Sequence, residues 1–208
     1  MEKQTLENFE WINKPEKFVV DRNRVLIETR PETDLWQRTY YGFQNANAPA
    51  FLTSLAGDFS FEVKAEFEET AFRYDQCGVL LFIDSENWVK VSVEYENETF
   101  ARLGSVVTNL GFSDWATTDI PAGISEMWYR VSRRGQDFYI ENSVDGTGVR
   151  QMRMLHMHKV SAEIKVGVYA CSPLKSNFNL IIPLGYAMGF RFFSLLEGRC
   201  QPLWLTEG

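Results

Sequence analysis

The sequence predicts an all-β protein, a β-sandwich or jelly roll of two antiparallel sheets, and three observations support this class. The stretch "DFSFEVKAEFE" (58–68) alternates apolar and polar side chains, which is typical of a strand with one buried face. The stretch "DQCGVLLFID" (75–84) is apolar on both faces, as in a central strand of a sandwich. Polar turns separate many such short segments, and none has a convincing helical period.

The remaining strands follow in chain order. Residues 17–29 indicate two short strands around Asp21–Arg24, and residues 87–96 follow 75–84 after the short polar link "DSEN", which predicts a hairpin. Further strands are expected at 106–109, 128–134, 137–143 and 164–171. Gly135-Gln136 and Asp145-Gly146 are turn signals beside them.

The C-terminal segment 179–208 departs from this pattern, because it is apolar, rich in Pro and Gly, and does not alternate. We expect it either to supply a closing strand, at 189–196, or to expose an apolar surface. An exposed apolar surface would favour self-association, so a homodimer is a possible state.

Length and charge limit the class of protein. The 208 residues suit one domain over 1–208, with 45% hydrophobic residues for a core. The net charge of −7 and the pI near 5.0 argue against nucleic acid or an anionic membrane as a partner. The three cysteines show no metal-binding spacing, and neither a signal peptide nor an apolar run of about 18 residues is evident. We therefore expect a cytoplasmic protein without cofactor or metal.

The stretch "NWVKVSVEYEN" (87–97) carries the first candidate site. Read with a period of two, one face holds valines, and the other holds Trp88, Lys90, Ser92 and Glu94. The mixed face is either a solvated strand surface or the floor of a ligand-binding face, where an indole ring stacks on a ligand and polar groups hydrogen-bond to it. Lys90 and Glu94 are expected to pair with each other or with Asp34 and Arg38.

Two more segments combine aromatic and polar side chains. "TDLWQRTYYGF" (33–43) suits a polar, ring-shaped ligand as well as it suits a core strand with a paired arginine. "VVTNLGFSDWATTD" (106–119) is expected to form a loop at the mouth of the sheet, or else reflects ordinary turn chemistry.

Other patterns give weaker signals. "EYENE" (94–98) places three glutamates on one strand face, but hydrolysis of a glycosidic bond needs two carboxyl groups at a defined separation. If the protein is an enzyme, Glu94 and a second acid (Asp34, Glu96 or Asp114) are the candidates. "HMH" (156–158) has no nearby third ligand for a metal, and Arg130, Arg133 and Arg134 are interpreted as a solvated strand end.

Several of these motifs occur together in a known family. In order, "TDLWQRTYYGF", "YDQCGVLLFIDSENWVKVSVEYEN", "VVTNLGFSDW", "SVDG" and "VGVYACSP" resemble a widespread family of concanavalin A-like jelly-roll proteins, DUF1349-like, which includes the fungal regulator-of-enolase proteins. The resemblance covers about residues 5–178. It implies two packed antiparallel sheets, one of them concave, and it does not imply a reaction.

The residues and the resemblance together predict a ligand site on the concave face. Its members combine aromatic rings with amide, hydroxyl and charged groups: Asp34, Trp36, Gln37, Tyr74, Gln76, Trp88, Lys90, Glu94, Thr108, Asn109, Asp114 and Trp115. The favoured function is non-catalytic binding of a carbohydrate or small polar metabolite, with a regulatory role. The alternatives are an interaction protein that regulates a metabolic enzyme and a glycoside hydrolase.

Overall fold

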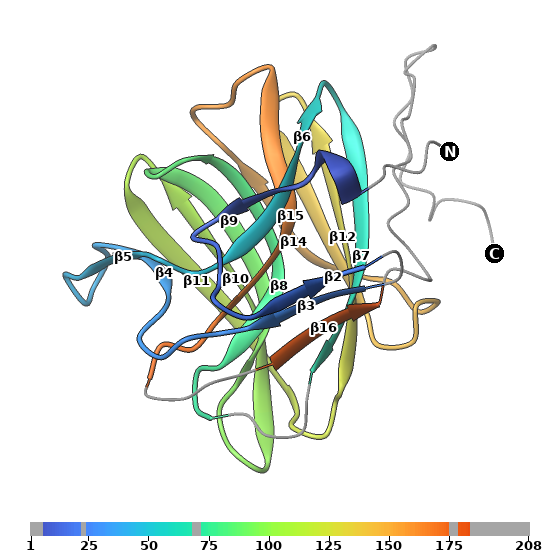
Figure 1. Cartoon of the computed structure of the whole chain (residues 1–208). Helices are drawn as coiled ribbons and strands as arrows, with labels where there is room; N and C mark the ends of the chain where they lie inside the picture. Colours follow the sequence, from blue (N-terminus) through green and yellow to red (C-terminus); the bar gives the residue numbers. More distant parts are fainter. Residues whose placement is uncertain (1–5, 22–23, 68–71, 175–178, 184–208) are drawn as a thin grey trace.

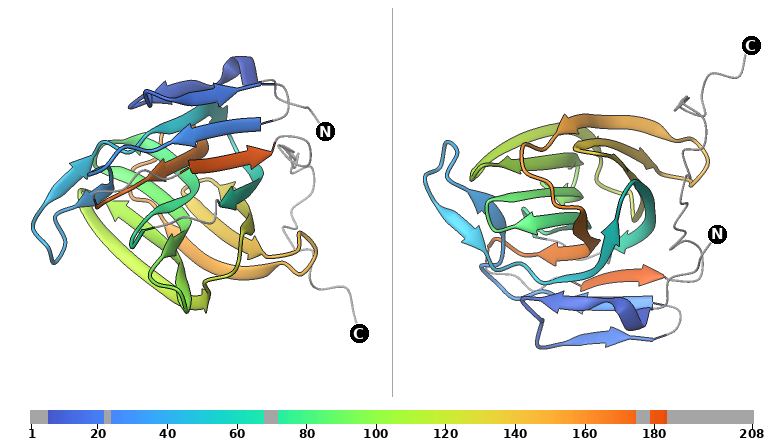
Figure 2. Two further views of the ribbon diagram at one scale, coloured as in Figure 1. Left: turned by 60° about the horizontal axis from the view of Figure 1, so that its bottom comes forward. Right: turned by 90° about the horizontal axis from the view of Figure 1, so that it is seen from above.

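The computed structural model describes residues 6–21, 24–67, 72–174 and 179–183, and it contains two seven-stranded antiparallel sheets that pack face to face (Figures 1 and 2). Sheet I has the order β1 (Glu10–Ile12), β6 (Ala50–Ala56), β15 (Glu163–Cys171), β8 (Gln76–Asp84), β9 (Asn87–Tyr95), β10 (Phe100–Asn109) and β11 (Phe112–Pro121). Sheet II has the order β14 (Arg150–His156), β13 (Asp137–Ser143), β12 (Glu126–Arg134), β7 (Phe59–Phe67), β16 (Asn179–Pro183), β3 (Arg24–Glu28) and β2 (Phe18–Val20).

The β-sandwich expected from the sequence is confirmed, together with most of its predicted strands. β7, β8, β9, β12, β13 and β15 lie within two residues of the expected boundaries. β8 and β9 form the expected hairpin, and so do β12 and β13 across Gly135. β2 and β3 pair around the Asp21–Arg24 turn, where the Arg24 amide donates to Asp21 Oδ1 over 3.0 Å.

The strand expected at 106–109 is confirmed as the end of β10, but the loop expected within 106–119 is wrong. The segment forms most of a hairpin of two ten-residue strands, β10 and β11, joined through Leu110 and Gly111. β11 is the edge strand of sheet I and most of its residues are exposed, so it lacks the apolar alternation by which a half-buried strand is recognised. The strands β1, β5, β6 and β14 were also not predicted.

Part of the C-terminal segment joins the sandwich. β16 pairs with β3 and β7 in sheet II, so residues 179–183 supply a strand earlier than expected. The strand expected at 189–196 lies outside the described residues. A 3₁₀-helix, Leu6–Asn8, precedes β1, and no helix in the described part of the chain is long and apolar enough to cross a bilayer.

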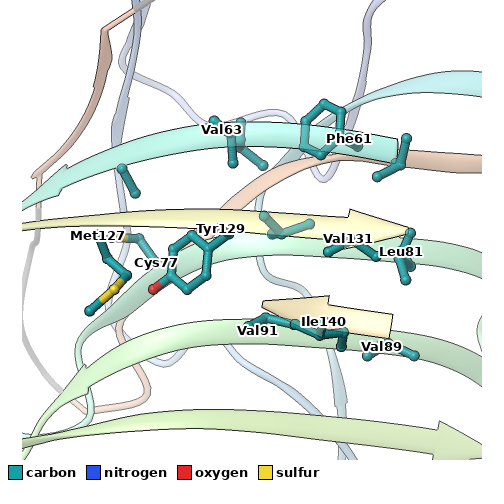
Figure 3. Packing of buried hydrophobic residues seen from close by; sticks show 14 of the residues in the cluster. Phe61, Val63, Cys77, Leu81, Val89, Val91, Met127, Tyr129, Val131 and Ile140 are labelled. Carbon is teal, nitrogen blue, oxygen red and sulfur yellow. The ribbon is translucent and has the colours of Figure 1, made fainter. Parts of the chain in front are cut away.

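The main core lies between the two sheets. Alternate residues of β8 and β9, such as Val79, Leu81, Val89 and Val91, face inward and are buried against β7, β12 and β13 (Figure 3). The other alternate residues of these strands point away from sheet II. We call that surface of sheet I the outer face.

A second, smaller core covers part of the outer face. A short hairpin, β4 (Leu35–Gln37) and β5 (Gln44–Ala46), projects beside sheet I (Figure 1). The cluster joins Leu35, Trp36 and Ala48 of this region to outer-face residues that include Leu80 and Trp88. The 33–43 segment is therefore held against the strand that the sequence singled out.

Candidate functional site

The register of sheet I brings the outer-face residues of four strands into rows. One row joins Gln76, Glu94 and Arg102 across β8, β9 and β10. The next row joins Gly78, Ser92 and Gly104, and the third joins Leu80, Lys90, Val106 and Trp115. Directly opposite residues on neighbouring strands are close enough for their side chains to interact, so the side chains within each row are neighbours.

Lys90 and Asp34 form a buried ion pair in the middle of this face. Lys90 Nζ lies 2.9 Å from Asp34 Oδ1, and their side chains are only 5% and 13% exposed. Burial lowers the pKa of Lys90, but Asp34, Cys171 and Glu94 together outweigh it, and the net pKa is raised. Lys90 is therefore charged and pairs with Asp34, whereas Arg38 pairs with Glu86 at the far end of the hairpin.

Gln76 connects three other polar side chains of the face. Its Nε2 donates to Glu94 Oε2 over 2.9 Å, and its Oε1 accepts from the Tyr169 hydroxyl over 2.9 Å. The Ser92 hydroxyl lies 3.5 Å from the same oxygen. The Cys171 thiol lies 3.8 Å from Asp34, so β15 also contributes to the network.

The carboxyl group of Glu94 is only half satisfied. Its Oε1 is buried and accepts no hydrogen bond from any described residue. Burial raises the pKa of Glu94 to about 7, against the opposing effect of Lys90. A buried polar atom without a partner is costly, so a ligand that reached this oxygen with a hydrogen-bond donor would relieve that cost.

Arg102 is directly opposite Glu94 on the neighbouring strand β10, and Trp115 of β11 contacts Arg102. The Arg102 guanidinium lies 5.5 Å from the centre of the Trp115 ring and 3.5 Å from the carboxylate of Glu96. Arg73 binds the same carboxylate, so Glu96 is neutralised by two arginines. Both Arg102 and Trp115 are partly exposed, which leaves a ring and a cation accessible on the same face as Glu94.

Two glycines lie between these groups, at positions where a side chain would collide with neighbouring atoms. A Cβ at Gly104 would lie 3.1 Å from Trp115 Nε1, and a Cβ at Gly78 would lie 2.0 Å from the Val91 carbonyl oxygen. The row of Gly78, Ser92 and Gly104 therefore presents backbone and one hydroxyl between the larger side chains on either side.

The opposite end of the outer face is closed. Trp88 is 1% exposed and belongs to the second core with Trp36, so it cannot serve as an open stacking platform. The backbone N–H of Gln37 donates to Ser113 Oγ over 2.9 Å, and Thr108 Oγ1 lies 2.7 Å from the same hydroxyl. These residues join the hairpin to the sheet.

Three other predicted site residues lie apart from this cluster. Asn109 and Asp114 are on the opposite side of the β10–β11 hairpin, where Asn109 Nδ2 donates to the His156 carbonyl and Arg153 binds Asp114. Tyr74 is at the margin, with its carbonyl accepting from Gln76 Nε2 over 3.2 Å. The structure thus brings together Asp34, Gln76, Lys90, Glu94 and Trp115, and it separates Asn109 and Asp114 from them.

Each of the three acids proposed to act with Glu94 is bound to at least one basic side chain. Asp34 is held by Lys90, Glu96 is bound by two arginines, and Asp114 is on the other side of the sheet. Among the described residues, no group of three or more His, Cys, Asp or Glu side chains is arranged to hold a metal ion. His156 instead contacts Asp137, with Nδ1 2.7 Å from Oδ1.

Sequence reasoning missed Arg102 and Tyr169. Arg102 precedes the predicted strand at 106–109, and extending the alternation of that strand backwards would have placed it on the same face as Thr108 and Val106. Tyr169 lies in the predicted strand 164–171, but strand order, which the sequence does not contain, is what brings it beside Gln76.

The fold and the polar cluster define a concanavalin A-like β-sandwich protein with a charged network on one sheet. The chain belongs to the DUF1349 family, described as proteins of unknown function, whose model matches residues 11–182. It is 30% identical over 185 residues to "Regulation of enolase protein 1" of Saccharomyces cerevisiae, covering 86% of this chain and 91% of that protein.

Two solved structures show the same fold. A functionally unknown protein from Saccharomyces cerevisiae superposes with a TM-score of 0.80 at 27% identity, covering 86% of this chain and 95% of that chain. The exoplasmic/lumenal domain of VIP36, solved with Ca²⁺ and Man3GlcNAc, superposes with a TM-score of 0.51 at 9% identity, covering 88% and 85%. At that identity the second likeness concerns the fold alone.

Proposed function

We propose that this protein is a non-catalytic, regulatory binding protein, located in the cytoplasm, that takes a carbohydrate or small polar metabolite at the open end of the outer face. The observation that carries the proposal is the buried, unpaired Oε1 of Glu94 on the same face as the partly exposed Arg102 and Trp115. A hydroxyl-rich ring suits this set, because the indole ring offers an apolar face and the carboxyl oxygen accepts from a hydroxyl.

Thermal shift against mono- and oligosaccharides and sugar phosphates tests this function. A ligand that binds the native state raises the melting temperature by mass action. We expect a hit with the wild type that disappears in Trp115→Ala and in Glu94→Gln. Trp128→Ala is the matched control, because Trp128 is a partly exposed tryptophan of sheet II. Silence across the panel, or a shift that Trp115→Ala retains, would reject the site.

A second candidate function is regulation of a metabolic enzyme through direct binding. Two observations favour it: the name of the yeast relative, which refers to enolase, and an exposed aromatic cluster at the tip of the β4–β5 hairpin. Purified enolase from the same organism is the probe. We expect a saturable complex by biolayer interferometry and a change in enolase turnover upon titration, and absence of both would reject this candidate.

A further inference from the structure

Five exposed apolar side chains gather where two turns meet. They come from the β4–β5 turn and the β10–β11 turn, and we call them the aromatic tip: Tyr40, Tyr41, Phe43, Leu110 and Phe112. Tyr40 is 94% exposed and Phe112 is 61% exposed. A contiguous apolar patch of this kind is typical of an interaction surface, whereas single exposed apolar residues are ordinary.

The rings of the tip are held in a fixed arrangement. Tyr41 lies 5.7 Å from Phe43 in a stacked geometry and 5.2 Å from Tyr40 edge to face. Below them, Trp36 contacts Tyr41 at 5.5 Å and is itself buried in the second core. The exposed rings therefore rest on a rigid base, so little conformational entropy is lost when a partner covers them.

Arg38 joins the two turns into one surface. Its Nη1 donates to Glu86 Oε2 over 2.6 Å and to the Gly111 carbonyl over 2.7 Å, and its Nη2 donates to Glu86 Oε1 over 3.1 Å. The guanidinium also lies 6.0 Å from the centre of the Phe112 ring. The guanidinium is already neutralised, so the tip offers apolar rings and not a free cation.

Of the six non-glycine residues with positive φ in the described part of the chain, three are at these two turns. Arg38, Tyr40 and Leu110 have φ values of 57°, 61° and 52°, in the left-handed region that favours glycine. Non-glycine residues in this region carry a conformational cost and cluster at functional sites. The side chains of Tyr40 and Leu110 are exposed, so the strain is not offset by burial of those side chains in the core.

The charge beside the tip distinguishes among possible occupants. Asp84 and Glu86 lie next to it, with the Glu86 carbonyl accepting from the Gly111 amide and Asp84 accepting from the Glu86 amide. Glu86 is neutralised by Arg38, so the carboxylate of Asp84 and the net charge of −7 are what disfavour an anionic lipid surface. A protein cavity that is apolar inside and basic at its rim complements both features.

We propose that the aromatic tip is the docking surface for a folded protein partner that presents an apolar cavity with a basic rim. This inference rests on the second candidate function and names the surface that would carry it. It is independent of ligand binding at Glu94, because the tip lies at the far end of the hairpin from the open end of the outer face.

The double variant Tyr40→Ser/Phe112→Ser tests the surface in the full chain. Both side chains are exposed, so we expect the variant to fold with an unchanged melting temperature. Its dissociation constant for the purified enzyme of the preceding subsection should rise roughly tenfold or more, as for central aromatic residues of an interface. The matched control is Val144→Ser/Met154→Ser, which removes exposed apolar surface near sheet II and should leave the constant unchanged.

Each outcome is decisive. Wild-type binding that the tip variant retains would overturn the docking surface and leave the enzyme partner standing. No binding by the wild type would overturn both. Light scattering on the free wild type and the tip variant tests whether the tip instead binds a second copy of this chain. A dimeric wild type and a monomeric tip variant would show self-association through the tip. That result would also overturn the proposal.

Discussion

Lys90, in the middle of β9, and Asp34, which immediately precedes β4, are 56 residues apart in the chain and form an ion pair with 2.9 Å between Nζ and Oδ1. The pair ties the β4–β5 hairpin to the outer face of sheet I. Because both side chains are buried, removal of one partner leaves a charge without compensation.

Replacing one member of this pair should therefore lower the free energy of unfolding more than replacing both members. We expect Asp34→Asn and Lys90→Met each to lower the free energy of unfolding by about 3–5 kcal/mol. The double variant Asp34→Asn/Lys90→Met should recover much of that loss, since no unpaired charge remains. Urea unfolding of the four proteins gives the coupling energy directly. Additive losses in the double variant would contradict the ion pair.

Glu94 should make stability depend on pH in a defined window. Its folded-state pKa is about 7, above the ordinary value of 4.5, so the native state binds the proton more tightly than the unfolded chain does. The stabilisation from the protonated form is complete below pH 4.5 and is lost as the pH rises through 7.

The variant Glu94→Gln isolates this effect. Each unit of pKa shift corresponds to about 1.4 kcal/mol, so above pH 7 the variant should exceed the wild type by at most about 3 kcal/mol, and the difference should shrink towards pH 4.5. Unfolding free energies of both proteins at pH 4.5, 6 and 8 provide the test. A difference that is independent of pH would show that the Glu94 carboxyl is not desolvated.

Trp88 and Trp115 should lose very different amounts of stability on truncation, although both are on the outer face. Trp88→Ala empties a fully buried site and should lower the free energy of unfolding by about 3–5 kcal/mol. Trp115→Ala removes a partly exposed ring from an edge strand and should cost much less. Chemical unfolding of the two variants measures the contrast. Similar losses would mean that Trp115 is also a core residue, and it could then no longer report on ligand binding.

The face of β9 could be predicted from its sequence, because a period of two fixes which side chains share a side. Trp88, Lys90, Ser92 and Glu94 do lie together, and Val89, Val91 and Val93 do face the main core. The alternation of side chains in β9 could not predict that the β4–β5 hairpin covers part of this face. Leu35 and Trp36 bury Trp88 through a long-range contact, and their own segment is only three residues of strand.

The alternation of side chains along a strand also explains why two of the predicted site residues lie apart from the others. Asn109 and Asp114 were grouped with Thr108 as members of a loop, in which orientation is not constrained. In the β10–β11 hairpin, Thr108 pairs with Ser113, so Asn109 and Asp114 must point to the other side. Recognising the two ten-residue strands would have placed Asn109 and Asp114 on the other side of the sheet, and it would have placed Arg102 on the outer face.

Gly78 should be among the least replaceable residues of sheet I. A Cβ there would lie 2.0 Å from the Val91 carbonyl oxygen and 3.0 Å from Ser92 Cα, both backbone atoms of the adjacent strand β9. Backbone cannot swing aside as a side-chain end can, so Gly78→Ala must separate β8 from β9 locally. We expect a loss of about 1–3 kcal/mol or more in the free energy of unfolding.

Gly123→Ala is the matched control for that substitution. A Cβ at Gly123 would meet no atom of the described residues within 4 Å, so its replacement should change the free energy of unfolding by only about 0.5 kcal/mol in either direction. Urea unfolding of both variants compares the same chemical change at a crowded and an open site. Equal effects would show that β8 and β9 are not in close contact at Gly78, and that a side chain can be accommodated there between Glu94 and Lys90.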